Sequence, residues 1–193
     1  MKKPITRRLI TFLQSKASGK AVLVLVALTT AIYLVMLLFT IPKVQSFAPE
    51  IQLFDLSPGG YSYEHALSLL ESLGREGRDV YLFWQLPLDY VYPGCFMVTY
   101  SLLLTWLFAK RFEARSKVFW LAIIPVFAGL FDYMENTLIV GMILSYPNVS
   151  RVLVHVAATF TVLKSSLSTV TFVSVLGGLV ILLIRKHPNV TQR

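Results

Sequence analysis

Four long apolar runs divide the chain, and each is long enough to cross a bilayer as a helix. About 20 consecutive apolar residues span the hydrocarbon core of a membrane at a rise of roughly 1.5 Å per residue. The runs cover residues 21–41, 86–109, 118–145 and 152–184. The pattern therefore predicts an all-α, polytopic membrane protein, in which residues 1–193 form one domain, a four-transmembrane-helix bundle.

Residues 42–85 form the largest connection between the apolar runs, and they contain a helical pattern of their own. Ser62 is a suitable helix cap, and Gly74 is suited to a left-handed helix end. Between them, apolar residues recur at helical spacing and predict an amphipathic helix over about 63–73; the stripe is Ala66, Leu69, Leu70 and Leu73. Such a stripe needs a surface to cover, and either the outer mouth of the bundle or the lipid headgroups would provide one.

Composition agrees with a membrane protein, and the charges predict its orientation. The chain is 55% hydrophobic, with a mean hydropathy of +0.66 and a net charge of +8. Thirteen of its 18 Lys and Arg residues lie in 1–20, 110–117 and after 184, against four in 42–85 and at Arg151. Positive residues stay on the cytoplasmic side, so we expect both termini to be cytoplasmic and residues 42–85 to be exoplasmic. Topology thus explains the net charge, and no nucleic-acid partner is expected.

The residues before the first apolar run, and the length of that run, help to define the kind of membrane protein. Residues 1–20 have a basic, amphipathic pattern that is typical of a cytoplasmic segment lying on an anionic leaflet. The apolar run 21–41 is longer than the roughly 7–15 residues of a signal-peptide core, which favours an uncleaved first helix. A bacterial cell membrane is the expected location, and an endomembrane is the alternative.

Cys95 is the single cysteine, so we expect no internal disulfide, no metal site and no cofactor.

Ionisable residues inside the apolar runs point to a site within the membrane. Such groups are costly in hydrocarbon and therefore need partners, protons or water. Asp132, Glu135 and Asn136 share one face of the third run by their spacing of three and four residues. Asp89 lies near the outer end of the second run, at a similar depth. Pro93 has no amide hydrogen to bond the Asp89 carbonyl, which predicts a kink and a free acceptor there.

The fourth run supplies two candidate bases that lie on opposite faces of the helix. His155 is near its outer end, whereas Lys164 lies deeper and shares a polar face with Thr161 and Ser168. We expect Lys164 to face the bundle and to pair with Asp132 or Glu135, although the pattern leaves open which of the two bases does so. The predicted ligand-binding residues are Asp89, Tyr92, Phe96, Tyr100, Asp132, Glu135, Asn136 and Lys164.

Three functions fit a buried pocket in which three carboxyls face one ammonium. The first is binding, and possible transformation, of a small lipophile or lipid, with a carboxyl that protonates or pairs with its polar group. The second is a non-enzymatic assembly role, in which the acids join helices and the partner is another membrane protein or a second copy. The third is a proton-coupled transporter acting as an oligomer. Whether the protein is an enzyme is left open; the candidates for catalysis are Asp132, Glu135 and Asp89.

Two resemblances bear on these hypotheses. The segments Leu73-Gly74-x-Glu76-Gly77-Arg78-x-x-Tyr81, Leu88-Asp89-x-x-Tyr92-Pro93 and Phe131-Asp132-Tyr133-x-Glu135-Asn136 look like the pattern of an uncharacterised family of small four-span integral membrane proteins. That resemblance covers nearly the whole chain and implies no activity. The architecture, with a long exoplasmic first loop and acids facing a membrane pocket, is more remotely similar to the emopamil-binding and sigma-2 receptor group. This likeness implies a sterol or another lipophile as ligand.

Overall fold

The structure is a computed structural model that describes residues 5–184, and these residues form helices joined by short connections, with no strand. Four helices are long and apolar enough to cross a membrane, which confirms the predicted all-α bundle of four spans. They are Gly19–Gln45, Gly74–Ala109, Lys117–Ser145 and Arg151–Ile184. A short helix, α1 (Ile5–Lys16), precedes the spans, and α4 (Tyr63–Ser72) lies between the first two.

Three of the spans contain more than one helical segment. The first joins α2 (Gly19–Val35) to α3 (Ile41–Gln45) through a π-helical turn, and the second joins α5 (Gly74–Val80) to α6 (Leu86–Ala109) through another. The third begins as a 3-10 helix and continues as α7 (Ile124–Ser145). The fourth is a single helix, α8 (Arg151–Ile184).

The helix ends differ from the expected spans at two places. The first helix does not stop at Pro42, because this proline lies in the first turn of α3, where its missing amide hydrogen costs little. The second helix begins at Gly74 rather than at Leu86, because the polar residues after Gly74 form a helix that leads directly into the apolar run. Gly74 itself has a φ of 60°, the left-handed conformation expected where α4 ends.

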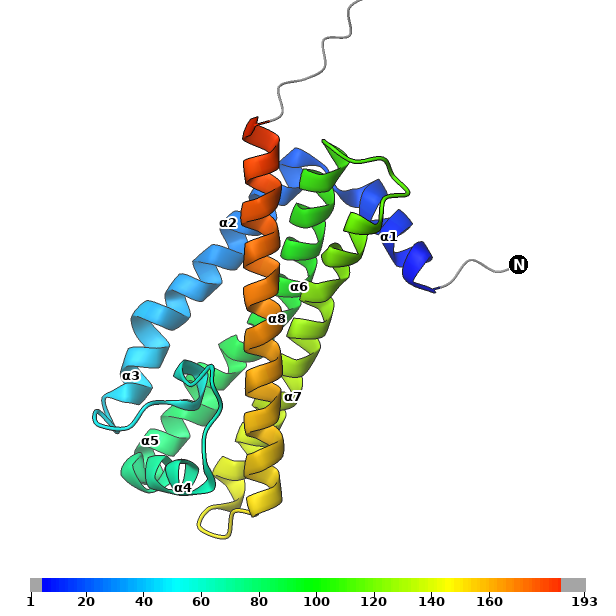
Figure 1. The fold of residues 1–193 in the computed structure, drawn as a ribbon. Helices are drawn as coiled ribbons and strands as arrows, with labels where there is room; N and C mark the ends of the chain where they lie inside the picture. Colours follow the sequence, from blue (N-terminus) through cyan, green and yellow to red (C-terminus); the bar gives the residue numbers. More distant parts are fainter. Residues whose placement is uncertain (1–4, 185–193) are drawn as a thin grey trace, which may run out of the picture.

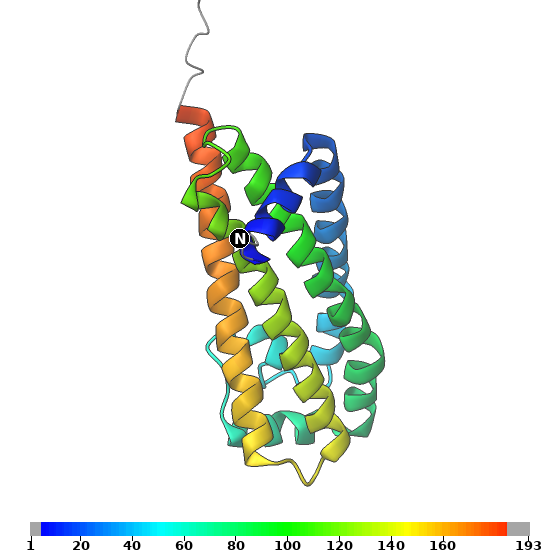
Figure 2. The same ribbon diagram turned by 90° about the vertical axis from the view of Figure 1, so that its right-hand side faces the viewer.

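The spans are arranged so that α2 stands slightly apart from the rest. Helix α7 packs against both α6 and α8, and α2 packs along α6. Figures 1 and 2 show both ends of the described chain at one end of the bundle, and α4 with its loops at the other. In Figure 1, α2 lies near α8 at the upper end and diverges from it toward α3 at the lower left.

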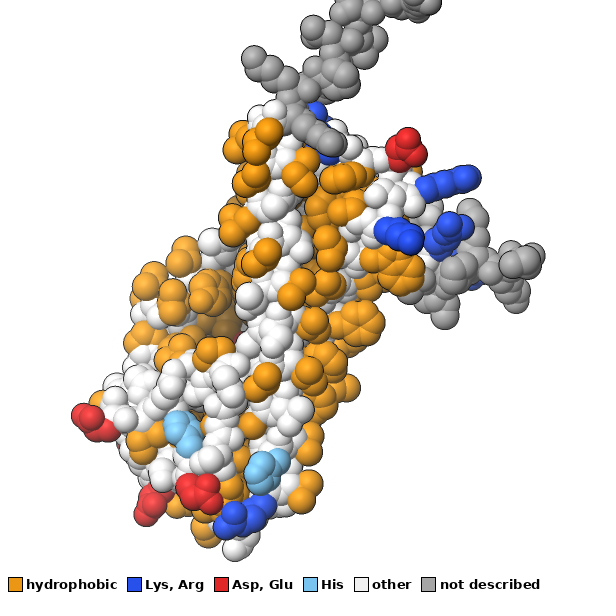
Figure 3. Space-filling view, in the orientation of Figure 1, with side chains coloured by type: hydrophobic (Ala, Val, Ile, Leu, Met, Phe, Trp, Pro, Cys, Tyr) orange, Lys and Arg blue, Asp and Glu red, His pale blue; other side chains and the backbone are white. Residues whose placement is uncertain are grey.

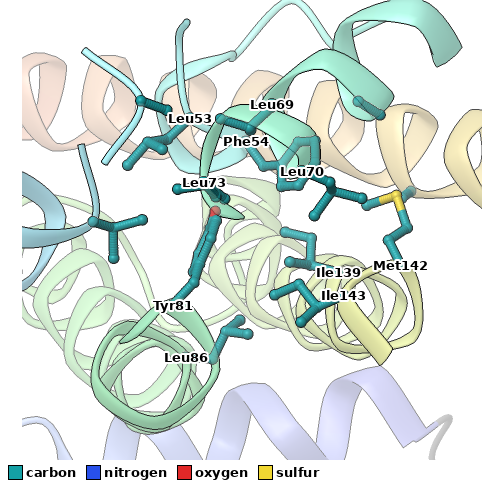
Figure 4. Packing of buried hydrophobic residues seen from close by; sticks show 14 of the residues in the cluster. Leu53, Phe54, Leu69, Leu70, Leu73, Tyr81, Leu86, Ile139, Met142 and Ile143 are labelled. Atoms are coloured by element: carbon teal, nitrogen blue, oxygen red, sulfur yellow. The ribbon is translucent and has the colours of Figure 1, made fainter. Parts of the chain in front are cut away.

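The loop and α4 form a layer over one end of the bundle, which we call the outer layer (residues 46–73). The predicted apolar stripe of α4 packs on the protein: Ala66, Leu69 and Leu70 are fully buried, against Ile139 and Met142 of α7. Figure 4 shows Leu69 and Leu70 together with Leu53 and Phe54 of the loop, above Ile139 and Met142. Ser62 caps α4 by accepting a hydrogen bond from the amide of His65 at 3.1 Å. The outer layer therefore covers the end of the bundle as part of its core.

Helix α1 packs part of its apolar face on the protein. Ile10 and Leu13 are buried against α6 and the 3-10 helix Lys117–Ile123, whereas Phe12 is 57% exposed. The exposed surface of α1 also carries the bases Arg7 and Arg8. Contact of this exposed surface with a leaflet stays a prediction.

Helices α6 and α7 approach each other closely at Gly129. A Cβ at this position would lie 2.3 Å from Met97 Cγ and 2.9 Å from the Pro93 carbonyl oxygen. Replacement of Gly129 by Ala is therefore expected to lower the free energy of unfolding by about 1–3 kcal/mol, since it forces the two helices apart. Thermal unfolding in detergent micelles measures the change.

The matched control is Gly177→Ala, because a Cβ at Gly177 meets nothing within 4 Å. In a helix, alanine is favoured over glycine by roughly 1 kcal/mol, so the control is expected to keep or gain stability. Equal melting temperatures for the two variants would show that α6 and α7 do not depend on this contact.

Candidate functional site

A buried ion-pair cluster joins α7 to α8. The ammonium of Lys164 lies 2.9 Å from Asp132 Oδ1 and 2.6 Å from Glu135 Oε2. Asp132 and Glu135 are three residues apart on α7, so one ammonium reaches both carboxyls. The side chains of Lys164 and Asp132 are only 16% and 13% exposed, and that of Glu135 is fully buried. Lys164, rather than His155, is thus the base that faces the bundle; His155 is exposed.

Thr161 hydrogen-bonds Glu135, whereas the buried hydroxyl of Tyr61 has no hydrogen-bond partner among the described residues. The hydroxyl of Thr161 donates to Glu135 Oε1 at 2.8 Å, one turn before Lys164 on α8. Tyr61 of the outer layer lies near this carboxyl, and burial raises the pKa of its phenol above the usual value, with a further rise from the charge of Glu135. The tyrosine therefore remains a neutral group beside the cluster.

Asp89 occupies the opposite side of the site, on α6. Its backbone carbonyl accepts a hydrogen bond from Asn136 Nδ2 at 2.7 Å, which satisfies the acceptor that Pro93 leaves free. The Asp89 side chain is 4% exposed, and its Oδ2 atom has no hydrogen-bond partner among the described residues. The site thus contains a buried carboxyl oxygen that the protein does not satisfy.

A fourth carboxyl, Asp55, comes from the outer layer and was not predicted. Tyr81 donates a hydrogen bond to it, and Gln85 Nε2 lies 3.4 Å from its other oxygen. Thr40 in turn donates to Gln85. Tyr81 and Gln85 are fully buried, so this network fixes the loop against the first two spans. Asp55 and Asp89 line the same cavity.

These groups surround a cavity of about 180 Å³ between the helices. Its polar lining includes Asp55, Asp89, Asp132, Lys164, Ser165 and Ser168. Tyr33 of α2 and Phe172 of α8 line its rim and are 43% and 42% exposed. Figure 3 shows the surface hollowed between α2 and α8. The cavity therefore opens laterally, between α2 and α8, rather than at the end of the bundle.

Aromatic rings also line the cavity. Tyr33 and Tyr92 lie 5.6 Å apart between ring centroids, and Phe96 lies 5.9 Å from Phe172 in an edge-on arrangement. A second hollow, of about 320 Å³, adjoins the cavity and shares Tyr33, Tyr92 and Phe172 with it. Tyr100 lines this second hollow. The two hollows are therefore neighbours, and the acids line only the first.

The eight residues predicted for the site are close together but play different structural parts. Five line the cavity: Asp89, Tyr92, Phe96, Asp132 and Lys164. Tyr100 lines the adjoining hollow, while Glu135 and Asn136 are fully buried behind the wall and hold Lys164 and the Asp89 backbone in place. Asp55, Tyr33 and Phe172 are lining residues that the sequence did not indicate.

The arrangement offers charge and hydrogen bonds but no metal-binding geometry. Within residues 5–184, no group of three or more His, Cys, Asp or Glu side chains is positioned to hold a metal ion. The cavity instead combines carboxyls, hydroxyls and aromatic faces, which suit an organic ligand with one polar end.

Comparisons with protein-family models, with curated proteins and with solved structures find no significant match to this chain, so its function is argued from the geometry of the site.

Proposed function

We propose that this protein binds a small lipophile or lipid inside the membrane, with the polar end of the ligand at the buried acids. The observation that carries the proposal is the sideways opening of a cavity with carboxyls at its base. Its apolar walls suit a hydrocarbon body, and its few polar groups suit a single head group.

The route of entry follows from what covers the site. The outer layer is packed over the end of the bundle, with Leu53, Phe54 and Leu70 fully buried. In contrast, the opening between α2 and α8 is lined by half-exposed side chains. A ligand dissolved in the bilayer therefore has direct access, whereas one in water must displace the outer layer.

The size of the site agrees with a lipophile of which only the head is enclosed. Binding sites for organic ligands usually measure about 300–1,000 Å³. The cavity alone is smaller than this range, at about 180 Å³, but the hollow of about 320 Å³ lies next to it and shares three of its lining residues. A head group fits the first space, and a chain or ring system fits the second.

The orientation expected from the charges is part of the proposal. We infer that the end with both termini faces the cytoplasm, since bases gather there and the outer layer contains four acids but no Lys or Arg. The bases exposed at that end include Arg7, Arg8, Lys16, Lys110 and Lys117. The site would then be entered from within the bilayer, at a distance from that basic end.

A bulky side chain at Ser168 tests the proposal. Ser168 lines the cavity, so Ser168→Trp is expected to fill it and to reduce bound lipophile by roughly tenfold or more, whereas Ser166→Trp points to exposed surface on the same helix and is expected to have no effect. Lipid extraction and native mass spectrometry of the purified proteins measure the bound species.

The outcome is decided by species that are enriched over bulk lipid in the wild type. Their loss from Ser168→Trp alone supports the proposal. An identical set of species in the wild type and both variants would contradict it and would favour the assembly role, in which the acids only join helices.

A further inference from the structure

The first span is attached to the rest of the molecule mainly at its two ends. Beyond its π-helical turn, Ile41 and Val44 of α3 are buried in the same hydrophobic cluster as the outer layer. At the opposite end of the span, Val22 is buried in a separate cluster with residues of α6. Thr29 is the single other buried side chain of α2. The middle of α2 therefore has few contacts that hold it against the bundle.

Two side-chain contacts join the middle of α2 to α6. The hydroxyls of Thr29 and Thr99 lie 2.7 Å apart and form a hydrogen bond. The rings of Tyr33 and Tyr92 lie 5.6 Å apart between centroids. Thr29 and Tyr33 also line the second hollow, together with Phe172 of α8. A movement of α2 away from α6 and α8 therefore widens this hollow and its opening.

The π-helical turn Met36–Thr40 provides a hinge for α2. The amide of Ile41 donates to the carbonyl of Met36, five residues earlier, so the backbone is wound more loosely there than in an α-helix. Pro42 follows, and it has no amide hydrogen for the bond to Leu38 that would continue an α-helix. Helices bend most often at such turns and at prolines. Both features lie between the anchored α3 and the weakly attached α2.

Hydrogen bonds hold the outer side of this hinge in place. Thr40 donates to Gln85 of the second span, and Gln85 donates to Asp55 of the outer layer. The second span has a comparable turn, Tyr81–Gln85, which is followed by Pro87. However, the helix after that turn, α6, packs against α2, α7 and α8. Of the two turns, only the one in the first span therefore leads into a helix that is free to tilt.

We propose that α2 is a lateral gate of the site, which pivots on the π-helical turn Met36–Thr40 and is closed by the hydrogen bond between Thr29 and Thr99. In the structure the gate is closed. Outward tilting of α2 breaks this bond and widens the hollow of about 320 Å³ beside the cavity, so that a larger molecule passes between α2 and α8. The purpose of the gate rests on the proposed function, but its movement is a property of the protein alone and is measured without a ligand.

Distances between α2 and α8 test the gate. Nitroxide labels are attached to Leu28→Cys and Val173→Cys, at exposed positions of the two helices, in full-length Cys95→Ser protein in phosphatidylcholine nanodiscs. Double electron–electron resonance is expected to show two populations, a closed one and an open one with a longer label separation. The control pair, Leu144→Cys and Val173→Cys, joins α7 to α8, which pack together, and is expected to give a single population.

Changes at the closing bond and at the hinge are expected to act in opposite directions. Thr29→Val/Thr99→Val removes both hydroxyls and is expected to raise the ratio of open to closed protein by about three- to tenfold, the usual strength of one hydrogen bond between membrane helices. Pro42→Ala supplies an amide that continues the α-helix across the hinge, so the stiffer helix is expected to lower this ratio. Pro87→Ala makes the same change after the other π-helical turn and is expected to leave the ratio unchanged.

The results separate the gate from the proposed function. One narrow distance between the labels at residues 28 and 173, unchanged in every variant, overturns the gate and leaves the lipophile site, which lipid extraction from Ser168→Trp tests separately. A higher open population in Thr29→Val/Thr99→Val and a lower one in Pro42→Ala support the gate. If the threonine double variant fails to fold, Pro42→Ala decides the outcome, because Pro42 is exposed; equal populations in Pro42→Ala and Pro87→Ala contradict the hinge.

Discussion

Lys164→Met is expected to lower the free energy of unfolding by about 3–5 kcal/mol, the usual cost of removing one partner from a buried ion pair. The substitution keeps an unbranched side chain of similar length but removes the ammonium that lies 2.9 Å from Asp132 and 2.6 Å from Glu135. Two carboxylates then remain at one turn of α7 without a counter-charge. Reversible thermal or denaturant unfolding in detergent micelles gives the change in stability.

The same reasoning predicts recovery when the acids are neutralised as well. The variant Lys164→Met/Asp132→Asn/Glu135→Gln has no uncompensated charge in the cluster, and the amide of residue 135 remains able to accept the hydrogen bond from Thr161. It is therefore expected to regain most of the lost stability. Lys20→Met, at an exposed position, is the control and is expected to change little. If Lys164→Met is as stable as this control, the cluster does not carry the charges assigned to it.

The ion-pair cluster was predictable because helical periodicity determines which residues share a face. Asp132 and Glu135 lie three residues apart, and the polar face of α8 contains Thr161, Lys164 and Ser168, so a pair between Lys164 and one of the two acids was expected, with His155 left as the other possible base. The contact between Asn136 and the Asp89 carbonyl was partly predictable, since Pro93 indicates a missing donor. The sequence indicated the free acceptor, whereas the identity of its donor is known only from the packing of α6 against α7.

Asp55 could not be identified in the same way. It is one of six acids in residues 42–85, and it lies on a short turn outside the regular helices, where spacing does not predict direction. Its position depends on the tertiary contacts of Tyr81 and Gln85, which come from a π-helical turn. The extra residue in such a turn changes the face that the following side chains occupy.

The lateral opening of the cavity could not be predicted from the sequence either. Apolar runs of similar length predict four spans, but they do not indicate that α2 packs along α6 and leaves a gap toward α8. The side chains at the rim, Tyr33 and Phe172, resemble ordinary lipid-facing residues when each is considered by itself. Only the packing of three helices shows that they flank the same cavity.

Phe54→Ala is expected to loosen the outer layer and to lower the free energy of unfolding by about 3–5 kcal/mol, the usual cost of emptying a buried phenylalanine site. Phe54 is fully buried, with its ring 4.6 Å from that of Tyr61 and 6.2 Å from that of Tyr81 between centroids. Loss of this ring removes the main apolar contact beside Asp55. Amide hydrogen exchange across residues 50–62, together with thermal unfolding, measures the effect.

Phe83→Ala is the matched control for this prediction, because Phe83 is 68% exposed and its truncation leaves no internal cavity. Faster exchange in the loop of Phe54→Ala alone is the expected result, and equal exchange in the two variants would show that the loop is held by other contacts. The comparison of Phe54→Ala with the wild type also tests the route by which a ligand or reagent enters the cavity. With the outer layer closed, Ser168→Trp is expected to block the ligand, since the lateral opening is then its way in. With the layer loosened by Phe54→Ala, a water-soluble carboxyl reagent is expected to reach Asp55 and Asp89 from the outer end, because the layer, rather than the helices, separates these acids from water.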